Sequence, residues 1–120
     1  MSVFNSKILA IILILLGEMI TIYAEMLLAR NNFSNPPSFL KVFWLPFLIM
    51  VLGGTLLITG YFTGFGVFKN IWIVSVISIT SILIIEPTLA FTIFHQLPTK
   101  GATSGFIFGA LGFILALLVK

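Results

Sequence analysis

The chain has 120 residues, of which 60% are hydrophobic and only 8% are charged, and its formal net charge is +3 at pH 7. Soluble domains carry about 25% charged residues, so this composition excludes a water-soluble enzyme and indicates lipid as the solvent. The sequence has no cysteine, one histidine and three carboxylates, too few groups for a metal cage or a hydrolytic triad. We therefore expect no enzyme activity, no cofactor and no metal.

Four apolar runs are long enough to cross a bilayer, which takes about 20 helical residues. They cover about residues 8–29, 42–67, 71–94 and 101–119. A turn-rich segment over residues 34–38 separates the first two runs, and only a few residues separate the others. Helices joined by short loops pack as antiparallel neighbours. The sequence therefore predicts an all-α integral membrane protein, with residues 1–120 forming one compact domain of four transmembrane helices.

The basic residues favour neither orientation in the membrane. In such a topology three lie on each side: Lys7, Lys69 and Lys120 on one, Arg30, Lys41 and Lys100 on the other. Because Lys and Arg in short loops set orientation, this balance leaves three alternatives. The chain inserts both ways and pairs head to tail with itself, a partner subunit fixes its direction, or a single orientation is set by something else. The scattered charges also argue against a nucleic-acid partner.

The first run is expected to be a retained helix rather than a signal peptide. It is longer than the apolar region of a signal peptide, and no small-x-small cleavage site follows it. This expectation favours a prokaryotic inner membrane as the location of the protein.

Glu18 lies near the midpoint of the first run, where an ionised carboxylate costs about 2.5 to 3.5 kcal/mol on insertion scales. Such a residue usually faces a protein interior or a watery cavity, so we treat it as the first candidate site for a proton or a cationic substrate. Thr21 and Glu25 fall on about the same helical face. Each glutamate has a structural alternative. Glu18 could be protonated and only hydrogen-bond to a neighbouring helix, and Glu25 could lie at the level of the lipid headgroups.

The third run carries a second set of polar candidates. Glu86 precedes Pro87, which frees a backbone carbonyl and is tolerated at membrane depth beside a cavity. Five other polar residues share one side of a helical wheel: Ser78, Ser81, Thr88, Thr92 and His95. This stripe predicts either interhelical hydrogen bonding or the wall of a polar pathway, and Glu86 projects away from it. His95 is expected at the interface.

Glycine spacing predicts a subunit contact in the fourth run. Gly101, Gly105 and Gly109 recur every four residues and Gly112 follows, which gives overlapping GxxxG motifs on one face. Glycines in the second run (Gly53, Gly54, Gly60 and Gly64) are assigned instead to packing within the chain or to a hinge.

Two stretches resemble a known family. The first is Leu16-Gly17-Glu18-Met19-Ile20-Thr21, which resembles the opening helix of small multidrug resistance transporters, where a membrane-embedded glutamate follows a Leu-Ala pair. The second is Glu86-Pro87-Thr88-Leu89-Ala90 with Leu97-Pro98-Thr99-Lys100-Gly101-Ala102 and Gly105, which resembles the last two helices of the drug/metabolite transporter superfamily. The similarity covers all four runs in order and length.

The resemblance implies an antiparallel, dual-topology homodimer in which the fourth helices touch and two copies of Glu18 share a central site. It also implies that protons and a cationic substrate compete for this glutamate. The third run departs from the family, because aliphatic residues and Thr80 replace its Tyr, Trp and Gly-x-Gly bend. Aromatic quaternary-ammonium drugs are therefore not the expected substrates.

These observations predict a small secondary transporter that exchanges protons for a small cationic or polar metabolite across the lipid bilayer. Its partner is a second copy or a homologous subunit. The alternatives are a non-transporting membrane subunit or scaffold, and one half of a lipid-linked-sugar flippase heterodimer.

Overall fold

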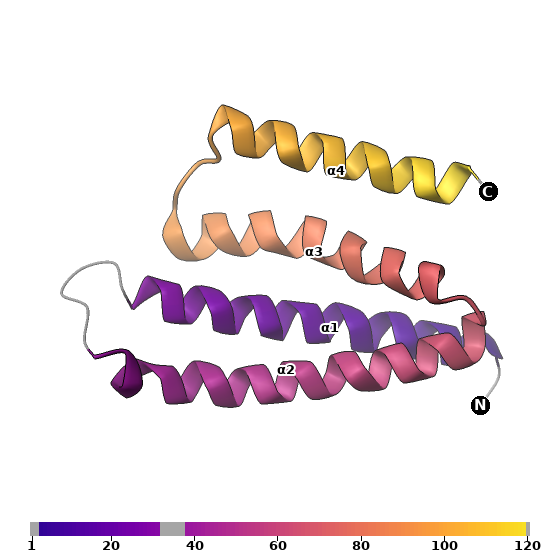
Figure 1. The fold of residues 1–120 in the computed structure, drawn as a ribbon, viewed down its shortest axis with the longest axis horizontal. Helices are drawn as coiled ribbons and strands as arrows, with labels where there is room; N and C mark the ends of the chain where they lie inside the picture. Colours follow the sequence, from indigo (N-terminus) through magenta and orange to yellow (C-terminus); the bar gives the residue numbers. More distant parts are fainter. Residues whose placement is uncertain (1–2, 32–37, 120) are drawn as a thin grey trace.

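The computed structural model describes residues 3–31 and 38–119, and in these ranges the chain forms four helices (Figure 1). They are α1 (Val3–Arg30), α2 (Phe39–Phe68), α3 (Ile71–Phe94) and α4 (Lys100–Leu118). Each helix is long and apolar enough to cross a membrane. The predicted all-helical class with four such helices is thus confirmed for the described ranges. Residues 34–37 of the turn-rich segment and Lys120 are among the residues that lie outside these ranges.

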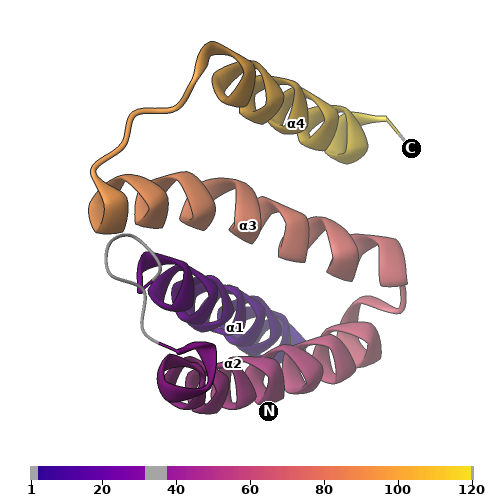
Figure 2. The same cartoon turned by 60° about the vertical axis from the view of Figure 1, so that its left-hand side comes forward.

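The helices alternate in direction, so α1 and α3 run one way and α2 and α4 the other (Figures 1 and 2). In the described part of the chain α1 packs against both α2 and α3, whereas α4 contacts α3 alone. The molecule measures 50 × 34 × 18 Å, and no residue of α4 is buried. The expected compact bundle therefore holds for α1, α2 and α3 but not for α4.

Small residues bring α1 and α2 into close contact. Gly17 of α1 faces Leu57, and on α2 Gly53 faces Thr21 and Gly60 faces Ile14. These pairs step three or four residues along α1 while stepping back equally along α2, which is the pattern of an antiparallel seam. Helix association in lipid depends on such close van der Waals approach, because lipid tails are as apolar as the side chains.

Short connections at both later turns follow from local backbone chemistry. Lys69 and His95 end α2 and α3 in the left-handed conformation, and their N–H groups donate to the carbonyls of Phe65 and Phe91. The next helix then begins within a few residues: the Asn70 side chain caps α3 by accepting from the N–H of Trp72. At the end of each helix this geometry satisfies one of the carbonyls that the helix itself leaves without a donor.

The tight seam makes a specific prediction for two adjacent glycines. A Cβ added at Gly53 would lie 2.6 Å from Thr21 Oγ1 and 2.9 Å from the Thr21 backbone nitrogen, while one added at Gly54 would meet nothing within 4 Å. We expect Gly53→Ala to lower the free energy of unfolding by about 1 to 3 kcal/mol through overpacking. Unfolding in mixed micelles by SDS titration, followed by far-ultraviolet circular dichroism, measures this change.

Gly54→Ala is the matched control. It should leave stability unchanged or raise it by up to about 1 kcal/mol, since Ala favours helix over Gly. Equal losses in the two variants would contradict the seam.

Candidate functional site

Glu18 is the centre of the candidate site. It lies near the middle of α1, and its side chain is only 8% exposed. Ser78 of α3, itself buried, donates a hydrogen bond from its Oγ to Glu18 Oε1 at 2.5 Å. This length is in the range of a hydroxyl that donates to a carboxylate. Glu18 thus faces the protein interior, as predicted, and its hydrogen-bond partner comes from a neighbouring helix.

The register between α1 and α3 creates this contact. The two helices run in the same direction, and Ile14 and Val74 are fully buried one turn before Glu18 and Ser78 respectively. The sequence pattern places Ser78 on the polar stripe of the third run but does not pair it with Glu18. A pairing depends on the offset between two helices, and helical periodicity carries no signal for that offset.

Thr21 lies on the α2 side of α1 rather than beside Ser78. Its Oγ1 is buried and has no hydrogen-bond partner in the described part of the chain. Gly53 faces this atom across the seam. Thr21 therefore places an unpaired hydroxyl within one turn of Glu18, and the absence of a side chain at Gly53 leaves room for it.

Glu25 and Glu86 lie in the C-terminal halves of α1 and α3, which run in the same direction. Glu25 is exposed and Glu86 is half-buried, and the carboxylate of Glu25 lies within electrostatic range of both Glu86 and Glu18. The parallel register brings Glu86 to Glu25, as it brings Ser78 to Glu18. α3 remains helical through Pro87, which is also half-buried. The structure thus brings Glu86 within electrostatic range of Glu25, whereas the sequence left the two features separate.

The rest of the predicted polar stripe is bonded within α3. Ser81 Oγ donates to the carbonyl of Ile77, Thr88 Oγ1 to that of Ile84, and Thr92 Oγ1 to that of Thr88. Thr88 and Thr92 are exposed, and only Ser81 is buried. His95 is exposed at the end of α3, as expected, with its ring against Phe91. These residues do not form a continuous polar wall with Glu18.

The four glycines of α4 divide into two groups. A Cβ added at Gly109 would lie 3.1 Å from Leu83 Cδ2, so Gly109 supports the contact of α4 with α3. Additions at Gly105 and Gly112 would meet nothing within 4 Å, and one at Gly101 would meet only the side chain of Thr99 at 3.9 Å. The predicted subunit face therefore remains open at Gly101, Gly105 and Gly112.

No group of three or more His, Cys, Asp or Glu side chains in the described ranges is arranged to hold a metal ion. The chemistry available at Glu18 is that of one buried carboxyl group with one hydroxyl donor. Such a group binds a proton or a small cation, because a buried charge must be neutralised.

The fold and site together define an all-helical chain of the kind found in integral membrane proteins, with a buried carboxylate at mid-helix. Comparisons with protein-family models, curated protein sequences and solved structures found no match to this chain. The resemblance to small multidrug resistance transporters therefore stays a prediction from the sequence.

The Glu18–Ser78 bond predicts a clear difference between two buried serines. Ser78→Ala leaves the Glu18 carboxyl group without this donor, so we expect the free energy of unfolding to fall by about 1 to 3 kcal/mol. Ser81→Ala removes only a bond to the carbonyl of its own helix and should change stability far less. The same SDS titration measures both variants. Equal effects would show that the contact between α1 and α3 does not depend on this bond.

Proposed function

We propose that the protein is a small secondary transporter of a prokaryotic inner membrane that exchanges protons for a small cationic or polar metabolite at Glu18. The observation that carries this proposal is the burial of Glu18 at mid-helix. Of the three glutamates, all of which lie in the described ranges, it alone is buried, since Glu25 is exposed and Glu86 half-buried. Ionisable residues inside a membrane protein are costly, and they usually mark substrate or proton pathways.

A single buried carboxylate couples two ligands by excluding one when the other binds. An uncompensated charge is unfavourable at this depth, so Glu18 holds either a proton or a cation. The Ser78 hydroxyl donates to the carboxylate and orients it between binding events. Exchange then follows if the site opens alternately to the two sides of the membrane.

Glu25 and Glu86 supply the proposed entrance. Their carboxylates lie at the same end of the molecule as Arg30, on the two helices that hold Glu18 and Ser78. Two negative charges at the mouth of a site raise the local concentration of cations. This arrangement supports a cationic substrate over an anionic one.

The decisive measurement is substrate-dependent current in proteoliposomes at two pH values, recorded for a panel of small amines, guanidinium compounds and neutral polar metabolites. Wild-type protein should give a current that changes with pH, because protons compete for Glu18. Glu18→Gln should lose the pH-dependent component, since an amide cannot exchange a proton in this range.

Thr55→Val is the matched control, because Thr55 is exposed on α2 and donates only to the carbonyl of Val51. It should keep the wild-type current. If Glu18→Gln moved substrate with the wild-type pH dependence, the proposed mechanism would be wrong.

We further propose that two copies form an antiparallel dimer through α4. Three observations support this assembly: α4 buries none of its residues, three of its glycines are open, and the basic residues divide evenly between the two sides of the membrane. Open glycines let a second helix approach closely in lipid.

Gly105→Leu should lower the dimer fraction without disturbing the monomer, because no atom lies within 4 Å of the added Cβ. Thr103→Leu is the control, since two residues along a helix turn the side chain by about 200°.

The chain has no cysteine, so Ser38→Cys at an exposed position gives one labelling site for energy transfer between chains in liposomes. A membrane-impermeant thiol reagent should reach about half of these cysteines in a dual-topology dimer. Complete or absent labelling would contradict it.

A further inference from the structure

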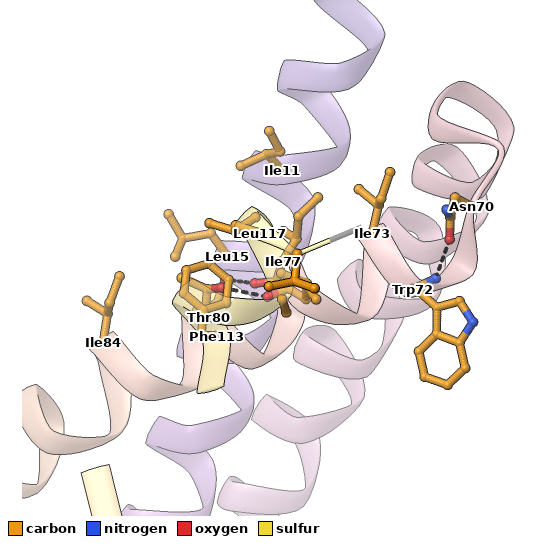
Figure 3. A pocket seen from close by; sticks show the side chains of 14 residues that line it. Ile11, Leu15, Asn70, Trp72, Ile73, Ile77, Thr80, Ile84, Phe113 and Leu117 are labelled. Atoms are coloured by element: carbon orange, nitrogen blue, oxygen red, sulfur yellow. Dashed lines mark hydrogen bonds between the residues drawn. The ribbon is translucent and has the colours of Figure 1, made fainter. Parts of the chain in front are cut away.

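A groove between α1, α3 and α4 forms a second feature that the Glu18 site does not use. Its volume is about 1010 Å³, and Glu18 does not line it. Figure 3 shows its apolar side chains, with Ile11 and Leu15 from α1, Ile77 and Ile84 from α3, and Leu117 from α4. α3 and α4 approach each other where Gly109 faces Leu83, and the groove extends from there toward the start of α3.

The two hydroxyl groups of the lining are already bonded within α3. Thr80 Oγ1 donates to the carbonyl of Val76 at 2.6 Å, and Ser81 Oγ donates to that of Ile77 at 2.9 Å. The lining therefore presents a hydrocarbon surface to whatever occupies it, with no hydroxyl donor directed to a polar ligand.

The length of the groove matches one leaflet of a bilayer. From Ile73 to Ile84 the helix rises by about 17 Å, at 1.5 Å per residue. Half of the hydrocarbon thickness of a bilayer is about 15 Å. The outer end lies at Asn70 and Trp72, where α3 begins, and an exposed tryptophan is typical of the membrane interface.

The outer end is positively charged. Lys69 directly precedes Asn70 and is exposed, and Lys7 lies one turn before Ile11 on the α1 face that lines the groove. The Lys7 ammonium lies 5.6 Å from the centre of the Phe68 ring, which holds it at this end of the molecule. The glutamates do not offset this charge: Glu18 lies near the middle of α1, and Glu25 and Glu86 lie in the C-terminal halves of α1 and α3, away from Asn70. The Asn70 side chain adds an amide group that donates hydrogen bonds.

We propose that this groove is a binding site for an anionic phospholipid, with one acyl chain lying between α3 and α4 and the headgroup at Lys7, Lys69 and Asn70. The apolar lining and its one-leaflet length fit the acyl chain. The two cations and the amide fit the phosphate of an anionic lipid. A zwitterionic headgroup fits less well, because its own ammonium group would lie near the two lysines. The site is independent of proton exchange at Glu18.

Native mass spectrometry of the detergent-solubilised protein tests the proposal, with dioleoyl phosphatidylglycerol and dioleoyl phosphatidylcholine added in equal amounts. We expect wild-type protein to retain phosphatidylglycerol in preference to phosphatidylcholine. Ala116→Phe places a ring into the groove and should abolish this retention. Ala110→Phe, an exposed position of the same helix that does not line the groove, should keep it.

A second variant tests the headgroup independently of packing. Lys69→Asn keeps a residue that tolerates the left-handed conformation at the end of α2 and removes the charge. It should reduce the preference for phosphatidylglycerol while some lipid is still retained. Three results would overturn the proposal: equal retention of the two lipids by the wild type, unchanged retention in Ala116→Phe, or a lipid-free wild-type dimer in which a second copy fills the groove.

Discussion

The close approach of α1 to α2 is the constraint on which the rest of the structure depends. Gly17, Gly53 and Gly60 leave no room for a Cβ across this seam, so the observed register depends on the absence of a side chain at these positions. Because lipid supplies no hydrophobic force between helices, small residues and a few polar bonds must fix the arrangement. With α2 covering one side of α1, the side that carries Glu18 turns to α3, where Ser78 meets it.

The long apolar runs predict the helices well, because a backbone in lipid must satisfy its own hydrogen bonds and helices do this locally. The inward orientation of Glu18 also follows from the sequence, since a carboxylate at mid-helix avoids lipid. The hydrogen bond between Glu18 and Ser78 and the electrostatic proximity of Glu25 to Glu86 do not follow from the sequence. They depend on the offset between α1 and α3, which is set by packing across both helices and leaves no periodic signal in either.

Polar residues on one side of a helical wheel do not by themselves make a polar pathway. The hydroxyls of Thr80, Thr88 and Thr92 each donate to a carbonyl one turn earlier in α3, which satisfies the hydroxyl and leaves the surface nearly apolar. Ser78 differs because a carboxylate is within reach, and a charged acceptor competes better for the donor than a backbone carbonyl does. Burial next to a carboxylate, rather than residue type, selects the hydroxyl that bonds across the helices.

The two proposed roles of α4, contact with a second copy and contact with a lipid, are compatible because Gly109 lies between the parts of the helix that they use. Gly109 holds α4 against Leu83 of α3. Before this contact Gly101 and Gly105 are open. After it Gly112 is open as well, while Phe113 and Leu117 line the groove with α3. A helix that docks on the first half need not enter the groove beside the second half. The sequence assigned all four glycines to one subunit interface. In the structure Gly109 packs within the chain, so only Gly101, Gly105 and Gly112 remain available to a partner.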